Sequence, residues 1–446
     1  MRKTEDHLSP DLHHLHPAQE NVFYEQILYE NSPIHTLGWY TLLEENIDIT
    51  LLQKVWDLLH QHIDILRLRI FINSDNEAIQ YIQEQSTPVL INEYNVSRLP
   101  DPENSAFLWM KQQTNTPINY LNETSYQITL IRLSNEKNYF FTTFHHILID
   151  SLGLYRLHEY VYKLYACIKN RTSTAWLAEI PQYLIAVKKS REYLNNFNYE
   201  DDENYWLDFL KKNEIHQLTP YYHNTGTNHH TLTLPFSVKN DLRAFCHENN
   251  THLLAVFSTL VSIVIAELTG QQELVFNTTI HGRTTKSEKY VVGMQANTYP
   301  VHCHISRTSS IVKQIKKVES ALKSSYLHGK FPNSHLTRLA KQYGFSLPNI
   351  FILYDRFSAS ATEINQTQHF FIDTEFNINP ILFRLKDYGY DQELKITIQY
   401  LQAYFSDSDI NNILERLNNL LTTIIDNPAV LVSELPILLE QERHTL

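Results

Sequence analysis

Residues 140–164, FFTTFHHILIDSLGLYRLHEYVYKL, constrain the fold most, because the hydrophobic period changes within them from that of a strand to that of a helix. Aromatic and β-branched residues at 139–147 are typical of a strand, and turn-prone residues 134–137 precede it. After Asp150, apolar residues recur at helical spacing, and Asp150 or Ser151 can cap that helix. Similar alternation later in the chain indicates an α/β or α+β protein built in layers.

Two adjacent histidines, His145 and His146, lie with Asp150 at this strand-to-helix junction. Alternation along a strand points the two histidines to opposite faces, so one can face a cavity while the other is packed. Junctions of this kind commonly carry function. From the residues alone, a catalytic role and an ordinary buried His–Asp pair both remain open.

Other histidines carry less information. The pairs His13–His14 and His229–His230 lack an acid four places after the second histidine. The tract formed by His7, His13, His14 and His16 has no partner ligands at a recognisable spacing, so we expect a solvated loop and no metal site.

Bulk properties exclude several classes of protein. A net charge of -12 without clustered Lys and Arg disfavours nucleic acid and membrane surfaces as partners. Three widely spaced cysteines, Cys167, Cys246 and Cys303, support neither a disulfide framework nor a zinc site. No phosphate-binding loop, dinucleotide fingerprint or serine nucleophile elbow occurs, so ATP use, hydride transfer and a serine acyl-enzyme are unsupported.

The termini and apolar runs predict a cytoplasmic protein. The N-terminus is polar and histidine-rich, unlike a secretory signal. The longest near-apolar run, residues 253–268, is shorter than the roughly 20 residues of a spanning helix and is predicted as a buried helix.

The order of predicted elements suggests two domains, as 446 residues exceed what one core usually serves. Asp48 can cap an amphipathic helix, residues 66–72 are predicted as a half-buried strand, and the strand from Tyr126 forms a hairpin with the histidine strand. A polar stretch at 170–181 is followed by a connecting helix at 183–209, which places a boundary near residue 180. Beyond it we expect a strand at 231–235, helices at 238–248 and 253–268, and a strand at 274–280.

Residues 145–151, HHILIDS, closely resemble the His-His-x-x-x-Asp-Gly signature of condensation domains from nonribosomal peptide synthetases, with Ser151 in place of glycine. Weaker matches follow in that family's order: residues 17–19 with Phe23, then 64–69, 183–206, 293–298 and 328–332, and finally 435–438 with Glu442 and Arg443.

The resemblance implies two lobes similar to chloramphenicol acetyltransferase, residues 1–180 with the motif and 181–446 without it, forming a V-shaped pseudo-dimer with a central channel. It implies that His146 is the central catalytic residue and that His145 and Asp150 organise the site. It also implies a structural Arg67–Asp150 salt bridge and a substrate approach near the Ser151 backbone amide. Serine tolerates a positive φ less well than glycine, so Gly153 is expected to supply flexibility.

The implied reaction condenses an acyl or aminoacyl thioester on a carrier protein with an amine, in nonribosomal peptide or lipopeptide biosynthesis. The partners would be acyl or peptidyl carrier proteins, which supply the phosphopantetheine, and a carrier-bound or free amine; the chain itself would bind no cofactor. A monomer is expected. The chain resembles a free-standing enzyme or an N-terminal starter domain, and its tail resembles the junction before an adenylation domain, so excision from a synthetase stays open.

Three alternatives stay open. One is an epimerising relative that shares the histidine pair. Another is an alcohol-acylating enzyme, disfavoured because the Asp-Phe-Gly-Trp-Gly segment of that family is absent. The last is a catalytically silent module that docks carrier proteins, suggested by Ser151.

Overall fold

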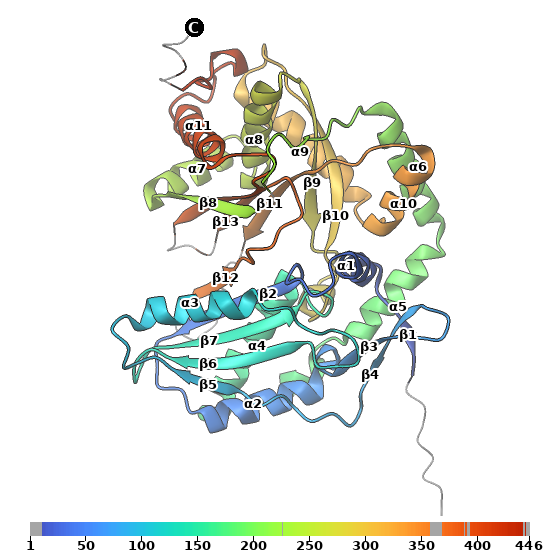
Figure 1. Cartoon of the computed structure of the whole chain (residues 1–446), viewed down its shortest axis with the longest axis vertical. Helices are drawn as coiled ribbons and strands as arrows, with labels where there is room; N and C mark the ends of the chain where they lie inside the picture. Colours follow the sequence, from blue (N-terminus) through green and yellow to red (C-terminus); the bar gives the residue numbers. More distant parts are fainter. Residues whose placement is uncertain are drawn as a thin grey trace, which may run out of the picture. The chain divides into compact units, whose positions relative to one another are not determined.

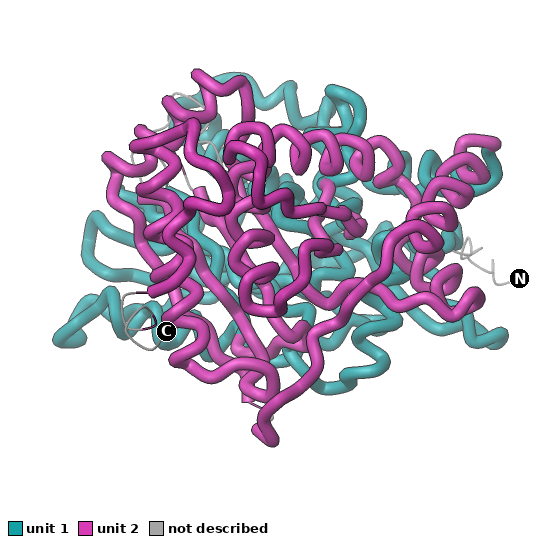
Figure 2. Tube along the Cα trace, turned by 90° about the horizontal axis from the view of Figure 1, so that it is seen from above, with its two compact units in different colours: residues 1–196, 281–296, 361–374 teal, residues 197–280, 297–360, 375–446 magenta. Residues whose placement is uncertain are grey.

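The computed structural model describes residues 11–224, 226–356, 368–387, 389, 393–439 and 442. The chain divides into two compact units, coloured separately in Figure 2. Unit 1 comprises residues 1–196, 281–296 and 361–374, and unit 2 comprises residues 197–280, 297–360 and 375–446. Arg443 of the tail motif and His7 of the histidine tract lie outside the described residues.

Unit 1 contains a five-stranded sheet in the order β12-β2-β7-β6-β5 and a small sheet in the order β1-β4-β3. Its helices are α1 (Pro17–Leu28), α2 (Ile49–His62), α3 (Pro102–Thr114), α4 (Ser151–Lys169) and α5 (Tyr183–Leu194). Its strands are β1 (His13–His14), β2 (Thr36–Leu43), β3 (Leu68–Ile72), β4 (Ala78–Ile82), β5 (Asn92–Asn95), β6 (Tyr126–Arg132), β7 (Asn138–His145) and β12 (Gln368–Ile372).

The histidine strand β7 lies at the centre of the larger sheet. It pairs antiparallel with β6, which confirms the predicted hairpin, and antiparallel with β2 on its other side. Phe140 packs against His158 of α4 while Phe141 packs against Trp109 of α3, so helices cover both faces of β7 (Figure 1). All eight residues of β7 are buried, which fixes its end firmly.

Caps and turns explain where several unit 1 elements begin. Asp48 accepts backbone hydrogen bonds at the start of α2, which confirms the predicted cap. Of the two candidate caps for α4, Asp150 fills the role and Ser151 is the first helical residue. The strand predicted for residues 66–72 begins only at Leu68, because residues Asp64–Arg67 form a 3-10 turn.

The predicted loop is wrong for the described part of the histidine tract, although His14 is exposed to solvent as expected. His13 and His14 form β1, which pairs with β4. His16 caps α1, with its Nδ1 accepting from the Ala18 N–H at 3.1 Å. Loss of hydration, assisted by Arg191, lowers the pKa of His16 to about 3.

Unit 2 contains a six-stranded sheet in the order β10-β9-β11-β13-β14-β8. Its helices are α6 (Phe197–Lys212), α7 (Phe236–Glu248), α8 (Leu253–Thr269), α9 (Ile311–Leu327), α10 (Asn333–Tyr343) and α11 (Asp407–Asp426). Its strands are β8 (Thr227–Leu234), β9 (Glu273–Ile280), β10 (Asn297–His304), β11 (Ile350–Arg356), β13 (Ile381–Asp387) and β14 (Leu394–Leu401). The predicted strands and helices of this region are confirmed with small shifts of their ends.

The core of unit 2 surrounds α8, whose residues are buried nearly all round. This helix contacts β9, β11 and β13 as well as helices α9 and α11. Within the described residues, no single helix is long and apolar enough to cross a membrane. Only α7 and α8 taken together reach that length, and they are bent by 103° at the break between them.

The boundary between the units lies at residues 196 and 197, whereas the sequence suggested residue 180. The predicted connecting helix is two helices, α5 and α6, and α5 belongs to unit 1. Asp64 holds it there by accepting hydrogen bonds from the backbone N–H groups of Tyr183 and Leu184, at 2.8 and 3.0 Å.

Candidate active site

The motif residues lie at the end of β7, where its register with β2 sets their positions. His145 pairs with Thr36, and the His146 N–H donates to the carbonyl of His35 at 2.7 Å. The chain then turns, with the Leu148 N–H donating to the His145 carbonyl at 3.0 Å, before α4 begins at Ser151. His146 therefore lies in the turn and not in the strand, because β7 ends two residues earlier than the sequence predicted.

His145 is a fully buried and fully bonded residue, 1% exposed. Its Nδ1 accepts the Ile147 N–H at 3.2 Å, which places the ring proton on Nε2, 3.1 Å from the side-chain oxygen of Gln26. Tyr120 stacks on the ring at 4.7 Å. Burial lowers the pKa of His145 well below its usual value, and the neighbouring histidines lower it further.

His146 is only partly buried, unlike His145. Its Nδ1 is buried and has no hydrogen-bond partner among the described residues. Burial, followed by the charge of His35, lowers the pKa of His146 to about 4, so the ring is neutral at pH 7. A neutral imidazole can accept a proton.

Asp150 is an ionised carboxylate whose two oxygens are saturated with donors. Arg283 donates to both oxygens, with Nη1 at 2.7 Å from Oδ2 and Nη2 at 3.0 Å from Oδ1. Backbone N–H groups of Gly153, Gln295 and Ala296 donate at 2.8 to 2.9 Å. Burial alone would raise the pKa of Asp150, but Arg283 and these hydrogen bonds outweigh it and hold the pKa below its usual value. The carboxylate is therefore a structural anchor.

Arg283 has a side chain that is completely buried. Its guanidinium also donates to the carbonyl oxygens of His281 at 2.8 Å and Gly293 at 2.9 Å. It thereby ties residues 281–296 of unit 1 to the start of α4.

The family model of the condensation domain matches residues 11–446. The chain belongs to the condensation domain family. It is 22% identical to surfactin synthase subunit 1 of Bacillus subtilis (strain 168), covering 96% of this chain and 12% of that protein. It is 23% identical to the dimodular nonribosomal peptide synthase of the same organism, covering 96% of this chain and 18% of that protein. The chain thus spans less than a fifth of the length of these relatives.

Solved condensation domains share the fold of this chain, which confirms the predicted layered α/β class. A starter condensation domain of rhizomide synthetase in complex with C8-CoA superposes with a TM-score of 0.83 at 17% identity, covering 95% of this chain and 96% of that one. The first condensation domain of the CDA synthetase gives a TM-score of 0.82 at 18% identity, covering 96% and 99%.

The expected Arg67–Asp150 salt bridge is wrong for this condensation domain. Arg67 lies 3.7 Å from Glu84 and donates to the carbonyl of Gln61 at 3.2 Å. The 3-10 turn at residues 64–67 directs its side chain there. Within the family match at residues 64–69, Asp64 has the structural role, because it accepts the backbone hydrogen bonds that hold the start of α5.

Ser151 takes the place of the family glycine without backbone strain. It is the first residue of α4 and is absent from the described non-glycine residues with positive φ. Its N–H lies at the first turn of a helix, where no intrahelical acceptor is available. The doubt that serine raised about this position is therefore not supported by its conformation.

Gly153 serves close packing and not the flexibility that we expected. A Cβ there would lie 2.9 Å from the backbone nitrogen of Gly293, and a Cβ on Gly293 would lie 2.1 Å from the ring of Tyr183. The Tyr183 hydroxyl donates to the Met294 carbonyl at 2.8 Å. The family's glycine-containing match at 293–298 thus packs against the helix that follows the motif.

Sequence reasoning missed three partners of the site: Arg283, His35 and Gln19. Gln19 donates to the Ile147 carbonyl at 3.0 Å and so fixes the motif turn. The family match at residues 17–19 signalled it. Arg283 is 133 residues from Asp150, and no local pattern selects it among the 37 lysines and arginines.

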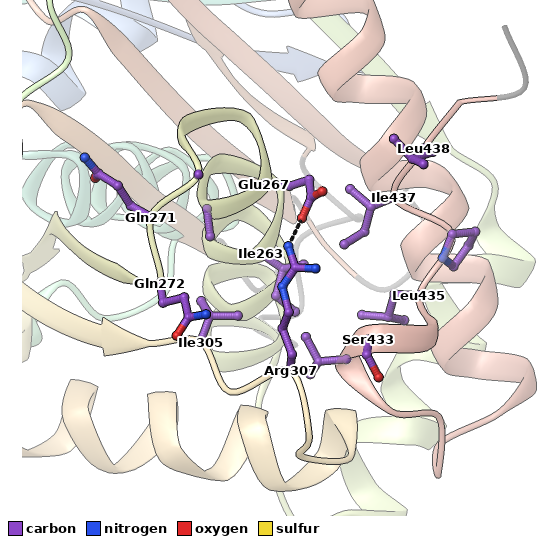
Figure 3. Close-up of a pocket in the computed structure, with 14 residues that line it drawn as sticks. Ile263, Glu267, Gln271, Gln272, Ile305, Arg307, Ser433, Leu435, Ile437 and Leu438 are labelled. Atoms are coloured by element: carbon purple, nitrogen blue, oxygen red, sulfur yellow. Dashed lines mark hydrogen bonds and ion pairs between the residues drawn. The ribbon is translucent and has the colours of Figure 1, made fainter. Parts of the chain in front are cut away.

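A separate cavity of about 350 Å³ lies in unit 2 (Figure 3). Ile263, Glu267 and Arg307 line it together with residues 432–433 and 435–438, and Arg307 pairs with Glu267 at 2.6 Å. None of the predicted site residues lines it. Among the described residues, no three His, Cys, Asp or Glu side chains are grouped to hold a metal ion.

Proposed function

We propose that this condensation domain forms an amide bond between an acyl or aminoacyl group, carried as a thioester on a carrier protein, and an amine. One observation carries the proposal: of the three motif residues, only His146 is partly exposed, with a neutral ring, while His145 and Asp150 are buried with their polar atoms engaged inside unit 1. We assign the reacting role to Nε2 of His146, because Nδ1 is buried.

The proposed step needs no enzyme nucleophile. The amine nitrogen attacks the thioester carbonyl carbon, the new C–N bond forms, and His146 takes one proton from the nitrogen. The C–S bond then breaks, and the same proton leaves with the phosphopantetheine sulfur as a thiol. Thioesters are already activated, so the main contribution of the protein is to hold both substrates together, worth about 7 to 11 kcal/mol of the barrier.

The partners in this proposal are acyl or peptidyl carrier proteins and a free or carrier-bound amine. A solved neighbour described as a starter condensation domain in complex with C8-CoA supports the inclusion of fatty acyl donors. The bound phosphopantetheine belongs to the carrier substrate.

The test is intact-mass detection of amide products with a panel of acyl-loaded and aminoacyl-loaded carriers and candidate amines. We expect product from the native chain and at least a hundredfold less from His146→Ala, as proton transfer typically contributes 10²- to 10⁴-fold. His230→Ala is the matched control. It removes the second histidine of the His229–His230 pair, which lies on β8 of unit 2 and lacks the motif acid. It should retain activity.

Other outcomes would redirect the assignment. Racemised aminoacyl carrier without acceptor would indicate epimerisation, and ester products from alcohols would indicate an alcohol acyltransferase. Carrier binding without any acyl movement across the panel, unchanged in His146→Ala, would overturn the proposed reaction and favour a docking module.

A further inference from the structure

His35 is a third histidine at the site, and the sheet places it there. It immediately precedes β2, whose first residue, Thr36, pairs with His145. Because β2 and β7 are antiparallel, continuing the register sets His35 opposite His146. The His146 N–H accordingly donates to the His35 carbonyl at 2.7 Å. Backbone pairing therefore places residue 35 opposite His146, independently of the side chain at residue 35.

The imidazole of His35 contacts the site and an acid. Its ring centroid lies 6.1 Å from that of His145 and 6.2 Å from that of His146. Its Nε2 lies 3.2 Å from a carboxylate oxygen of Glu25 on α1, and its side chain is only 10% exposed. The carboxylate of Glu25 therefore holds the imidazole of His35 beside the two motif histidines.

The other groups around His146 do not supply the same charge. His145 is neutral, with both ring nitrogens engaged, and Tyr120 stacks on it. Asp150 acts in the opposite direction on His146, but its charge is shared with Arg283. His35 is therefore the basic side chain that His146 meets across the strand pair, at a ring separation of 6.2 Å.

We infer that His35 is a positioning residue which, held by Glu25 and set opposite His146 by the sheet register, keeps the His146 imidazole unprotonated and thus ready to accept a proton. The inference rests on the proposed function, since only a proton acceptor benefits from this arrangement. Like charges on adjacent imidazoles oppose each other, which is the physical basis of the effect.

The test is a histidine ¹³Cε1 NMR titration of the full chain, with the His146 signal assigned from its loss in His146→Gln. Starting from a pKa of about 4, we expect His35→Gln to raise the titration of His146 by about one pH unit. At pH 5 the protonated fraction would grow about fivefold, from about a tenth to about half. His35→Arg keeps a cation and should leave the fraction near its native value.

His60→Gln is the matched control, because His60 is a buried histidine of α2 that hydrogen-bonds Ser86 outside the motif. Circular dichroism at pH 5 confirms that each variant is folded. Equal His146 titration in the native chain and His35→Gln, or an equal rise in His35→Gln and His35→Arg, would overturn the inference.

This readout separates the two proposals. Absence of amide product overturns the proposed reaction while the NMR result still stands. Where product forms, the acid limb of kcat/KM should move upward in His35→Gln by the same pH interval, and an unmoved limb contradicts the inference alone.

Discussion

The two units stabilise their interiors in different ways. Unit 1 buries histidines within hydrogen-bond networks: His158 of α4 bonds Thr142 at 2.9 Å and Thr41 at 3.1 Å, and Thr41 also bonds His369 of β12 at 2.8 Å. Unit 2 buries a continuous aliphatic and aromatic core around α8. The stability of unit 1, which carries the motif, therefore depends on the protonation of buried histidines. The stability of unit 2 depends mainly on apolar packing.

A close ion pair with both side chains buried occurs in each unit. Asp150 lies 2.7 Å from Arg283 in unit 1, and Asp387 lies 2.7 Å from Lys239 in unit 2. Of these two carboxylates, Asp150 is the one that belongs to the His-His-x-x-x-Asp motif. A comparison of the two pairs therefore distinguishes the effect of a buried carboxylate on protein stability from its effect on the motif site.

The largest expected effect comes from removing these carboxylates. Asp150→Ala and Asp387→Ala each remove the carboxylate from a buried ion pair, so we expect either to lower the free energy of unfolding by about 3 to 5 kcal/mol. Denaturant titration measures this loss. Amide formation per folded molecule should fall only in Asp150→Ala, and equal activity in both variants would contradict the distinction.

The second effect is an acid-induced loss of stability in unit 1. Burial lowers the pKa of His146 and of His369 to about 4 and that of His158 well below its usual value. Since an unfolded histidine titrates near about 6.5, the unfolded chain binds more protons between these values. Stability is full above about pH 6.5 and falls toward pH 4, by up to about 1.4 kcal/mol per pH unit for each histidine.

Hydrogen exchange measured at pH 7 and pH 5 tests this prediction segment by segment. Amides of β2, β7 and β12 should lose protection, after correction for intrinsic exchange, before those of β9 and β13. His369→Gln removes one titrating group and should flatten the pH dependence. A unit 2 that loses protection first would contradict the comparison.

A third, smaller effect concerns a glycine of unit 1 that packs against backbone. Gly153→Ala should lower the free energy of unfolding by about 1 to 3 kcal/mol, because its Cβ would meet the Gly293 backbone at 2.9 Å. Thermal denaturation measures the loss. A gain in stability, as expected for an exposed helical glycine, would show that residues 281–296 do not pack as described.

The smallest effect concerns a unit 2 glycine in open space. Gly344 ends α10 at φ 73°, and a Cβ there would contact nothing within 4 Å. Gly344→Ala should lower the free energy of unfolding by about 1 kcal/mol through backbone strain alone. Gly344→Asn should lower it by less, because asparagine tolerates the left-handed conformation better. If both variants matched the native melting temperature, the left-handed cap would be unimportant to unit 2.

Local patterns predicted the elements well. The change from aromatic and β-branched residues to helical spacing at Asp150 located β7 and α4. Asp48 was identified as a cap, and the second cap was narrowed to Asp150 or Ser151. These succeed because a cap and an amphipathic face depend on residues close in sequence.

Long-range partners were beyond the same reasoning. Arg67 was chosen as the partner of Asp150 through the family resemblance, yet a 3-10 turn directs it elsewhere and Arg283 fills the role. His35 stands opposite His146 only because of the β2–β7 register, which the sequence did not specify. His16 was placed in a solvated loop, although an imidazole nitrogen can cap a helix.

The long separation between Asp150 and Arg283 affects how the protein is made. Their 133-residue separation, at a ribosomal rate of about 5 to 20 residues per second, means roughly 7 to 27 s between their syntheses. During that interval the nascent chain holds an acid whose counter-ion has not yet been translated. A polypeptide cut after α5 would lack that counter-ion permanently, so unit 1 cannot mature as an autonomous N-terminal fragment and must wait for sequence that follows the first strands of unit 2.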